Sequence, residues 1–312
     1  MLAVLALALA LPAPALSQSA RPTVTTGGTA GLTPSSVTVL GRVDPNGAQT
    51  TYFFQYGPTP LYGAATPELV AGSGTAAINV VAGLAGLAPA TRYHYRLVAR
   101  NRHGLVMGAD RTFRTRNQPL GLTLAATPNP VALDRPTILA GTLSGTGNAG
   151  RPIVLQANPF PYTQGFVTIA NPQLTNAQGA FAFPLLSVPR NSQFRVLIPD
   201  RPQVASPIVL VSVAVRVSTN VSSRRVRPGG RVRFFGRVTP ARPGARMAIQ
   251  RLRGRRWVTV AGMLTRRASS RHSRYGKTIR IRRGGRYRVF VEVVDGSFVS
   301  SAGRTVTISR RR

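Results

Sequence analysis

Apolar and polar residues alternate with a period of two along much of the chain. In the clearest run, apolar positions alternate with polar ones: Tyr93, Tyr95, Leu97 and Ala99 lie between Arg92, His94, Arg96 and Arg100. This period is typical of a β-strand with one buried and one solvated face. No long run after the N-terminus has the spacing of an amphipathic helix, so the pattern predicts an all-β protein.

Glycine and proline separate these apolar runs. The 31 Gly and 25 Pro are spread along the chain without a strict period, which favours many turns and short strands over collagen or disorder. A parallel α/β architecture is disfavoured, because the pattern offers no crossover helices. The 312 residues are enough for about three domains of roughly 100 residues each.

A corner motif marks the first domain. Leu87 and Pro89 precede Tyr93 at the start of a strand, the arrangement of a tyrosine corner, in which the ring is buried and the hydroxyl bonds to upstream backbone. Together with V-T-V-L-G-R-V-D-P-N-G at 37–47 and T-Y-F-F-Q-Y-G at 51–57, this motif makes residues 22–115 resemble a fibronectin type III module of secreted bacterial proteins. The resemblance implies a β-sandwich that serves as a binding or spacer unit and no catalytic residue.

One feature departs from that family. Many fibronectin type III modules carry a Trp on an early strand, and this segment has none. We therefore expect the aromatic side chains of Tyr52, Phe54 and Tyr56 to fill the space.

Two later segments resemble each other. In each segment a Gly is followed by a second Gly, then by a Gln, and then by a triplet of an aromatic residue, Arg and Val. The corresponding positions are Gly141 and Gly236, Gly150 and Gly244, Gln156 and Gln250, and Phe194 and Tyr287. Strands at this spacing with turn signals favour immunoglobulin-like sandwiches. We expect a signal peptide at 1–19, a fibronectin type III-like domain at 20–116, and immunoglobulin-like domains at 121–212 and 213–312.

The N-terminus is typical of an export signal. An apolar run from Leu2 to Leu11 is followed by small residues, as in a secretory signal peptide, and the run is shorter than the roughly 20 residues that span a bilayer. No Lys or Arg precedes it, which a misassigned start codon would explain; a disordered apolar tail is the alternative. No apolar tail follows, since the chain ends at Arg310–Arg312. We expect a secreted or envelope-associated protein.

Positive charge is concentrated in the last segment. The chain has 41 Lys and Arg against seven acids. Residues 213–312 hold 27 of the basic residues and two of the acids, whereas residues 121–212 hold five and two. Such a field should bind polyanions with a strong dependence on salt. A compositional bias of the genome would explain some of the arginine, but not this difference between two related segments.

Several arginines in the last segment alternate with apolar residues. Arg231 and Arg233 flank Val232, and Arg286 and Arg288 flank Tyr287, so the guanidinium groups should project from an outer sheet face. Guanidinium groups match phosphate and carboxylate in a bidentate fashion. The candidate anion-binding residues are Arg225, Arg227, Arg231, Arg233, Arg253, Arg255, Arg256, Arg280, Arg282, Arg286 and Arg288.

Catalytic and metal chemistry finds little support. The absence of Cys excludes thiol catalysis, disulfides and Cys-based metal sites. Only Glu292 and Asp295 are carboxylates close in sequence, and Asp295-Gly296 is better explained as a turn with an ion pair to a neighbouring Arg. His94 and His103 are expected at the surface, so we expect no metal, no cofactor and no small-molecule substrate.

The sequence therefore favours a non-enzymatic, exported protein of β-sandwich domains. Its basic last domain would contact anionic envelope polymers or other polyanions, and the first domain would act as a spacer or contact other surface proteins. Two alternatives stay open. One is a non-catalytic accessory protein of secreted carbohydrate-active enzymes, which needs exposed aromatic rows, and the other is a nucleic-acid-binding protein, which needs stacking aromatics.

Overall fold

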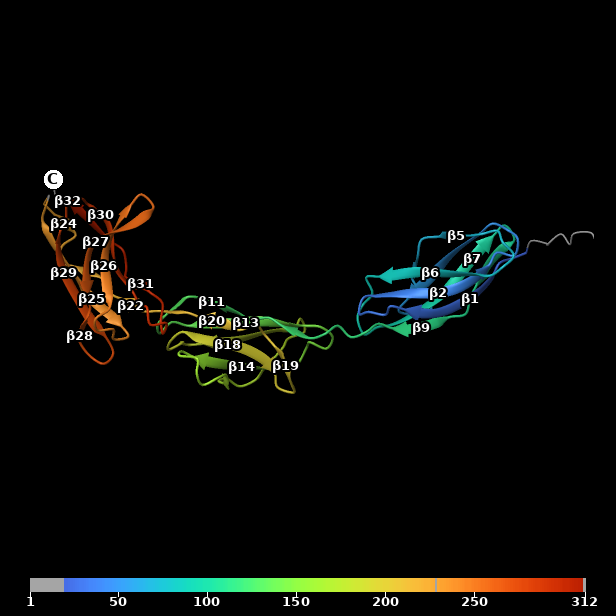
Figure 1. Cartoon of the computed structure of the whole chain (residues 1–312), viewed down its shortest axis with the longest axis horizontal. Helices are drawn as coiled ribbons and strands as arrows, with labels where there is room; N and C mark the ends of the chain where they lie inside the picture. The colour runs from blue at the N-terminus through green and yellow to red at the C-terminus, as the bar shows by residue number, and fades with distance from the viewer. Residues whose placement is uncertain (1–19, 228, 311–312) are drawn as a thin grey trace, which may run out of the picture. The chain divides into compact units, whose positions relative to one another are not determined.

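Every regular element that the structure describes is a β-strand (Figure 1). The computed structural model describes residues 20–227 and 229–310, and the predicted signal peptide at 1–19 lies outside the described residues. Most strand pairs are antiparallel, and the predicted all-β class is confirmed. The chain divides into two units, Met1–Pro119 and Leu120–Arg312, and each is described by itself.

The first unit is a β-sandwich, called here the first sandwich. Its strands are β1 (Thr23–Ala30), β2 (Ser36–Asp44), β3 (Thr50–Gly57), β4 (Ala64–Ala65), β5 (Leu69–Gly72), β6 (Ile78–Ala85), β7 (Arg92–Asn101), β8 (Gly104–Met107) and β9 (Arg111–Arg114). One sheet has the order β1-β2-β6. The other has the order β4-β3-β7-β8, with β5 also paired to β3 and β9 to β7.

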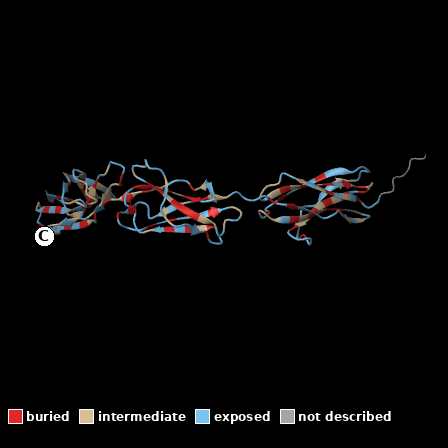
Figure 2. Cartoon of the chain, turned by 90° about the horizontal axis from the view of Figure 1, so that it is seen from below, coloured by how far each residue is buried: buried red, intermediate tan, exposed pale blue. Residues whose placement is uncertain are grey.

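Alternate side chains of both sheets fill the core of this sandwich, and Figure 2 shows buried and exposed positions alternating along its strands. Tyr95 and Leu97 of β7 are fully buried, as the sequence pattern predicted. Tyr52 and Phe54 are buried in the same cluster, and Tyr56 is half-buried against it. These aromatics occupy the core as expected where the Trp is missing.

The corner before β7 ties the loop to the strand. The backbone N–H of Ala88 donates a hydrogen bond to Tyr93 Oη at 2.9 Å, while Leu87 is buried in the core. The Tyr93 ring stacks on Phe113 with 5.5 Å between centroids. This is the geometry of a tyrosine corner.

The second unit begins with the second sandwich. Its strands are β10 (Gly121–Leu122), β11 (Ala125–Thr127), β12 (Val131–Ala132), β13 (Thr137–Ser144), β14 (Pro152–Pro159), β15 (Val167–Thr168), β16 (Gln173–Leu174), β17 (Ala180–Leu185), β18 (Ser192–Ile198), β19 (Arg201–Ala205), β20 (Val209–Val211) and β21 (Val213–Ala214). Strand β21 begins just beyond residue 212, where we expected the domain to end, and still pairs with β12.

The third sandwich completes the unit. Its strands are β22 (Arg216–Val217), β23 (Asn220–Val221), β24 (Arg225–Val226), β25 (Arg231–Thr239), β26 (Arg246–Arg253), β27 (Arg256–Leu264), β28 (Arg266–Arg267), β29 (Ser273–Arg280), β30 (Gly285–Val291), β31 (Ser301–Ala302) and β32 (Val306–Arg310). Its alternating apolar residues, including Val232, Phe234 and Ile249, are fully buried.

The second and third sandwiches pair their strands in the same order. Strand β13 pairs with β10, β11 and β17, and β25 pairs in the same way with β22, β23 and β29. In the opposite sheets, β18 pairs with β14 and β20, whereas β30 pairs with β26 and β32. Each sandwich also has a short parallel pair, β12 with β21 and β24 with β32. The shared order matches the repeat read from the sequence.

The repeated glycines mark a close backbone crossing. A Cβ at Gly141 would lie 2.0 Å from the carbonyl oxygen of Thr123, and a Cβ at Gly236 would lie 2.0 Å from that of Ser218. No side chain fits at either distance. The segment between β10 and β11 can therefore pass close to β13 only at a glycine, and the same holds for the segment between β22 and β23 beside β25.

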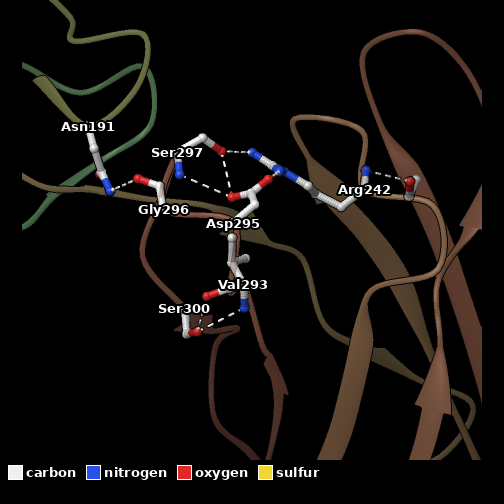
Figure 3. A network of polar contacts seen from close by, with 8 residues as sticks. Asn191, Arg242, Val293, Asp295, Gly296, Ser297 and Ser300 are labelled. Atoms are coloured by element: carbon white, nitrogen blue, oxygen red, sulfur yellow. Dashed lines mark hydrogen bonds and ion pairs between the residues drawn. The ribbon is translucent and has the colours of Figure 1, made fainter. Parts of the chain in front are cut away.

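A joint connects the second and third sandwiches (Figure 3). The side-chain amide of Asn191, which is buried, donates to the Gly296 carbonyl at 2.8 Å and accepts from the Val213 N–H at 2.7 Å. The Asn191 N–H also donates to the Ser297 carbonyl at 2.8 Å. Buried apolar residues of both sandwiches form one continuous cluster. The two sandwiches are therefore held by a polar clamp and a shared core.

An ion pair supports the loop that enters this joint. Arg242 pairs with Asp295, and its guanidinium carbon lies 4.7 Å from the centroid of the Phe298 ring. Asp295 also accepts hydrogen bonds from the N–H and hydroxyl of Ser297 at 3.1 and 2.8 Å. Burial of Asp295 opposes ionisation, but the bonds from Ser297 and Arg242 outweigh it and hold the pKa of this carboxyl below its usual value.

Candidate anion-binding surface

One arginine in each sandwich lies between a glutamine and an aromatic ring. The distances from Arg Nε to Gln Oε1 are 2.7, 2.9 and 2.8 Å in chain order. The guanidinium carbon lies 4.6, 4.3 and 4.4 Å from the ring centroid in the same order. The three sets are Arg96, Gln55 and Tyr62; Arg195, Gln156 and Phe166; and Arg288, Gln250 and Trp257. A hydrogen bond with a cation–π contact fixes each arginine on its sheet.

These sets explain the repeated Gln and aromatic-Arg-Val positions. Gln156 lies directly across the ladder from Arg195, and Gln250 lies directly across from Arg288. Arg288 is thus bound within the protein, and burial lowers its pKa. Its structural contacts set it apart from the other arginines of the predicted anion-binding group.

An array of arginines covers the outer face of the β25–β29–β28 sheet. Arg237 lies directly opposite Arg274, which lies directly opposite Arg266, and Arg231 lies opposite Arg280. These arginines and Arg233 of β25 are all exposed. We call the following group the arginine face: Arg231, Arg233, Arg237, Arg266 and Arg274.

The arginine face contains a hollow. It has a volume of about 780 Å³, and its lining includes the side chains of Arg233, Arg266 and Arg274. Phe235 is 38% exposed on the same strand, with the Arg233 guanidinium carbon 5.6 Å from its ring centroid. Gly276 lies directly opposite Phe235 and adds no side chain there. Three arginines therefore line the hollow, and one of them, Arg233, also contacts an exposed aromatic ring.

Corresponding positions of the second sandwich are uncharged. Gly141 lies directly opposite Phe181, just as Gly236 lies opposite Tyr275, so these residues align the two sheets. The outward positions that match Arg233, Phe235, Arg237, Arg274 and Gly276 are Ile138, Ala140, Thr142, Ala180 and Ala182. The array of arginines is a property of the third sandwich and not of the shared fold.

The eleven predicted arginines do not form one surface. Arg231 and Arg233 lie on β25, whereas Arg286 and Arg288 lie on β30 in the opposite sheet. The others lie near strand ends and in turns: Arg225, Arg227, Arg253, Arg255, Arg256, Arg280 and Arg282.

Sequence reasoning missed three members of the arginine face. Arg237, Arg266 and Arg274 belong to separate segments, and only the pairing of β25, β28 and β29 brings them into one row. Alternation around a buried residue could have pointed to Arg274, because Tyr275 next to it is buried. Nothing local indicated that the three side chains would be neighbours.

Negative charge lies elsewhere in the third sandwich. Its two carboxylates, Glu292 and Asp295, follow β30 and line a hollow of about 620 Å³ with Arg242 and Arg246. Asp295 forms an ion pair with Arg242, as the sequence analysis predicted for this turn carboxylate and a nearby arginine. No ion pair between described residues involves the arginine face, so this face carries uncompensated positive charge.

The first sandwich holds a separate polar cluster. His94 Nδ1 lies 2.8 Å from Asp110 Oδ2, and the Tyr62 hydroxyl donates to Asp110 Oδ1 at 2.9 Å. Burial opposes ionisation of Asp110, but its bonds to His94 and Tyr62 outweigh that effect and lower the pKa of this carboxyl. His94, expected at the surface, is instead half-buried and paired, while His103 is exposed. Within residues 20–227 and 229–310, no three His, Asp or Glu side chains converge as metal ligands.

Aromatic side chains are scarce on the described surface. Of the aromatic residues in the described ranges, only Phe235 is exposed, and the others are buried or half-buried. Trp257 is half-buried beneath Arg288. The described part of the chain also contains no helix long and apolar enough to cross a membrane.

Comparison with known proteins gives limited similarity. No protein-family model and no curated protein matches the chain. It is similar to the FN1–FN3 domains of chicken CNTN1, with 14% identity over 94% of this chain and 99% of that one and a TM-score of 0.30. A titin segment gives 15% identity over 94% and 100%, with a TM-score of 0.37. A tetra-tandem repeat of a large adhesion protein gives 12% over 92% and 74%, with a TM-score of 0.28. The strand pairing of the chain itself establishes its β-sandwich fold.

Proposed function

We propose that the chain is an exported, non-catalytic binding protein whose third sandwich holds it to anionic polymers of the cell envelope. The observation that carries the proposal is the arginine face. Two like-charged pairs lie directly across the strands there, namely Arg237 with Arg274 and Arg266 with Arg274, and Arg231 of the face lies directly opposite Arg280. The second sandwich has the same strand order and holds the uncharged residues Thr142 and Ala180 at the positions that match Arg237 and Arg274.

Like charges directly opposite in a sheet destabilise it, by about 0.2–1 kcal/mol for each pair. A bound polyanion would remove this repulsion, and its phosphate or carboxylate groups would accept paired hydrogen bonds from the guanidinium forks. Nearly all of the charge is arginine rather than lysine, since Lys277 is the chain's only Lys. A sheet that exposes several arginines, three of which line a hollow, is therefore suited to binding anions.

The proposed location outside the cytoplasm is supported by the apolar N-terminal run. Single-strand nucleic-acid binders use several aromatic side chains for base stacking, and an accessory module for glycans would also need exposed aromatics. Within the described ranges only Phe235 has that exposure. An envelope polyanion is thus the better-supported partner.

The proposal is tested by retention on isolated anionic envelope material. The test variant combines Arg233→Gln, Arg237→Gln and Arg274→Gln, which removes three charges from the arginine face. Its retention should fall by about tenfold or more at about 0.15 M salt, because charged hydrogen bonds and released counterions are both lost.

A control with equal net charge separates site from bulk charge. The control combines Arg92→Gln, Arg135→Gln and Arg201→Gln, three exposed side chains of the first and second sandwiches. Its retention should stay within about twofold of the unmodified chain. Equal losses in the two variants would mean that charge acts only as a whole. Retention that does not respond to salt, on a neutral glycan, would support an accessory role for carbohydrate-active enzymes.

A further inference from the structure

A third hollow lies at one end of the third sandwich, beside the arginine face. It has a volume of about 560 Å³, and its lining includes Thr259 and Tyr287. Five arginines also line it, and we call them the arginine groove: Arg251, Arg253, Arg280, Arg282 and Arg283.

Both sheets of the sandwich contribute to this groove. Arg251 and Arg253 come from the end of β26, whereas Arg280 ends β29 and Arg282 follows it in the turn to β30. Arg251 lies directly opposite the buried Tyr287, so its side chain leaves the strand on the inner face of the sheet. The arginines thus converge at the open end of the sandwich.

The groove contains an unsatisfied donor. Arg251 Nε is buried and has no hydrogen-bond partner among the described residues. A buried N–H of a charged group is costly unless it is hydrogen-bonded. Both carboxylates of the third sandwich, Glu292 and Asp295, line the separate hollow described above. An anion in the groove would satisfy Arg251 and neutralise its neighbours.

The second sandwich uses the same end of the fold differently. When the two Gln–Arg pairs are aligned, four of the groove positions, those of Arg251, Arg253, Arg280 and Arg282, hold the uncharged residues Ala157, Pro159, Ser187 and Pro189, whereas the position of Arg283 holds Arg190. The buried Val188 and Ile281 correspond in this alignment.

That end of the second sandwich is a docking surface. Asn191 at this end bonds to Gly296 and Ser297 of the third sandwich, and a Cβ at Gly296 would lie 3.0 Å from the Phe160 ring. At the equivalent end of the third sandwich, four positions that are uncharged in the second sandwich hold arginine. The chemistry of this end is therefore suited to an anion rather than to another sandwich.

We infer that the arginine groove binds closely spaced phosphate groups of a phosphate-bearing polymer chain. This inference rests on the proposed function and assigns it a site and a ligand class. Five guanidinium groups around one hollow exceed what a single carboxylate can neutralise, whereas adjacent phosphates supply several charges and many acceptor oxygens. A hollow of about 560 Å³ admits a segment of a thin chain. A planar bilayer surface cannot enter it.

The test measures the binding of tripolyphosphate and of long-chain polyphosphate to the full chain by calorimetry at about 0.15 M salt. The groove variant is Arg253→Gln with Arg283→Gln, two exposed side chains. The face variant, Arg237→Gln with Arg274→Gln, removes the same charge. Tripolyphosphate binding should weaken at least about tenfold in the groove variant and less than about threefold in the face variant.

Arg251→Lys provides a second measurement, because it keeps the charge and removes the planar fork. It should also weaken tripolyphosphate binding, by about threefold or more. The fluorescence of Trp257, the chain's only Trp, reports whether each variant keeps the third sandwich folded.

Each other outcome overturns the inference. Equal loss in the groove and face variants would place the phosphate contacts across the whole surface, and the proposed function would survive. If the unmodified chain bound neither polyphosphate nor envelope material, both the groove inference and the proposed function would be wrong. Tighter binding of single-stranded DNA, or of phosphatidylserine vesicles, than of polyphosphate at equal phosphate concentration would make a nucleic acid or a membrane surface the partner in place of a phosphate-bearing polymer of the envelope.

Discussion

The second and third sandwiches have the same strand order, the same crossing glycine and the same Gln–Arg–aromatic set, yet they differ in nearly everything that faces solvent. Residues 121–212 carry five basic residues, whereas residues 213–312 carry 27, with two acids in each segment. The difference shows that inward positions and close backbone crossings specify this fold. Outward positions are free to carry either an uncharged or a strongly basic surface.

The two sandwiches also differ in what occupies one end. In the second sandwich, Asn191 and Phe160 at that end contact the third sandwich. In the third sandwich, the equivalent end holds the arginine groove. One end of the fold thus serves as a joint in one copy and as a candidate anion site in the other.

The largest expected effect comes from breaking the feature that the sandwiches share. Gly236→Ala would place a Cβ 2.0 Å from the Ser218 carbonyl oxygen, so the crossing strand must move. We expect the free energy of unfolding of the third sandwich to fall by about 3 kcal/mol, measured by denaturant unfolding with Trp257 fluorescence. Gly262→Ala is the control, because its Cβ would meet nothing closer than 3.8 Å. Equal effects of the two changes would contradict the crossing argument.

The next effect is a pH dependence of stability that we expect in the third sandwich and not in the second. Burial raises the pKa of Tyr275 to about 12, while the matching residue of the second sandwich is Phe181. A raised pKa gives stability that is complete below the unfolded value of 10.0 and is lost as pH rises through about 12. We expect the third sandwich to lose about 2–3 kcal/mol of unfolding free energy across this window.

The comparison is made with Tyr275→Phe, followed by Trp257 fluorescence in denaturant between pH 9 and pH 12. This variant loses the hydrogen bond from the Tyr275 hydroxyl to the Ser218 carbonyl, so it should be less stable by about 1 kcal/mol at neutral pH. Above pH 10, however, its stability should depend much less on pH. An unchanged dependence in the variant would assign the effect to other groups.

A smaller effect should come from opening the joint. Asn191→Ala removes the acceptor of the Val213 N–H and the donor to the Gly296 carbonyl, leaving buried groups unpaired at a cost of about 2 kcal/mol. Calorimetry should then show the second and third sandwiches unfolding less cooperatively than in the unmodified chain. Asn129→Ala is the control, since its side chain makes two similar backbone bonds to residues 210 and 212 but is exposed. A joint that contributes nothing would give two identical calorimetric profiles.

The smallest effect concerns the arginine that both sandwiches keep. Arg288→Lys should cost about 1 kcal/mol, because lysine cannot combine the bond to Gln250 with planar stacking on Trp257. The emission maximum of Trp257 should shift to the red as its ring becomes more exposed. The same substitution at Arg195 should leave Trp257 emission unchanged, and a shift there would mean that the two sets are coupled.

Much of the fold could be predicted from local pattern. The period of two over residues 92–100 correctly placed Tyr95 and Leu97 inside, and the aligned Gly and Gln positions reflect the same strand order in both sandwiches. These features are local or repeat at fixed spacing. The joint at Asn191 could not be predicted, because its partners Gly296 and Ser297 lie about a hundred residues away.

The candidate site was predictable in its chemistry but not in its arrangement. Composition pointed to the last segment, and alternation pointed to Arg231 and Arg233. Alternation also suggested Arg288, which is instead held by Gln250 and Trp257. The row through Arg274 and the groove around Arg251 depend on strand register and on a turn. Neither strand register nor the position of a turn can be read from the residues adjacent to these arginines in the sequence.

The salt dependence of long-chain polyphosphate binding shows whether the positive charge of the third sandwich is arranged as a binding site. One variant removes four arginines of the face and groove: Arg237, Arg253, Arg274 and Arg283, each changed to Gln. The matched control changes four exposed arginines of the first and second sandwiches to Gln: Arg42, Arg92, Arg135 and Arg201.

We expect the slope of log affinity against log salt to fall by about 0.7 for each lost phosphate contact, so by about 3 in the first variant and by little in the control. Equal slopes in the two variants would contradict this expectation, because the charge would then act as a bulk property of the chain.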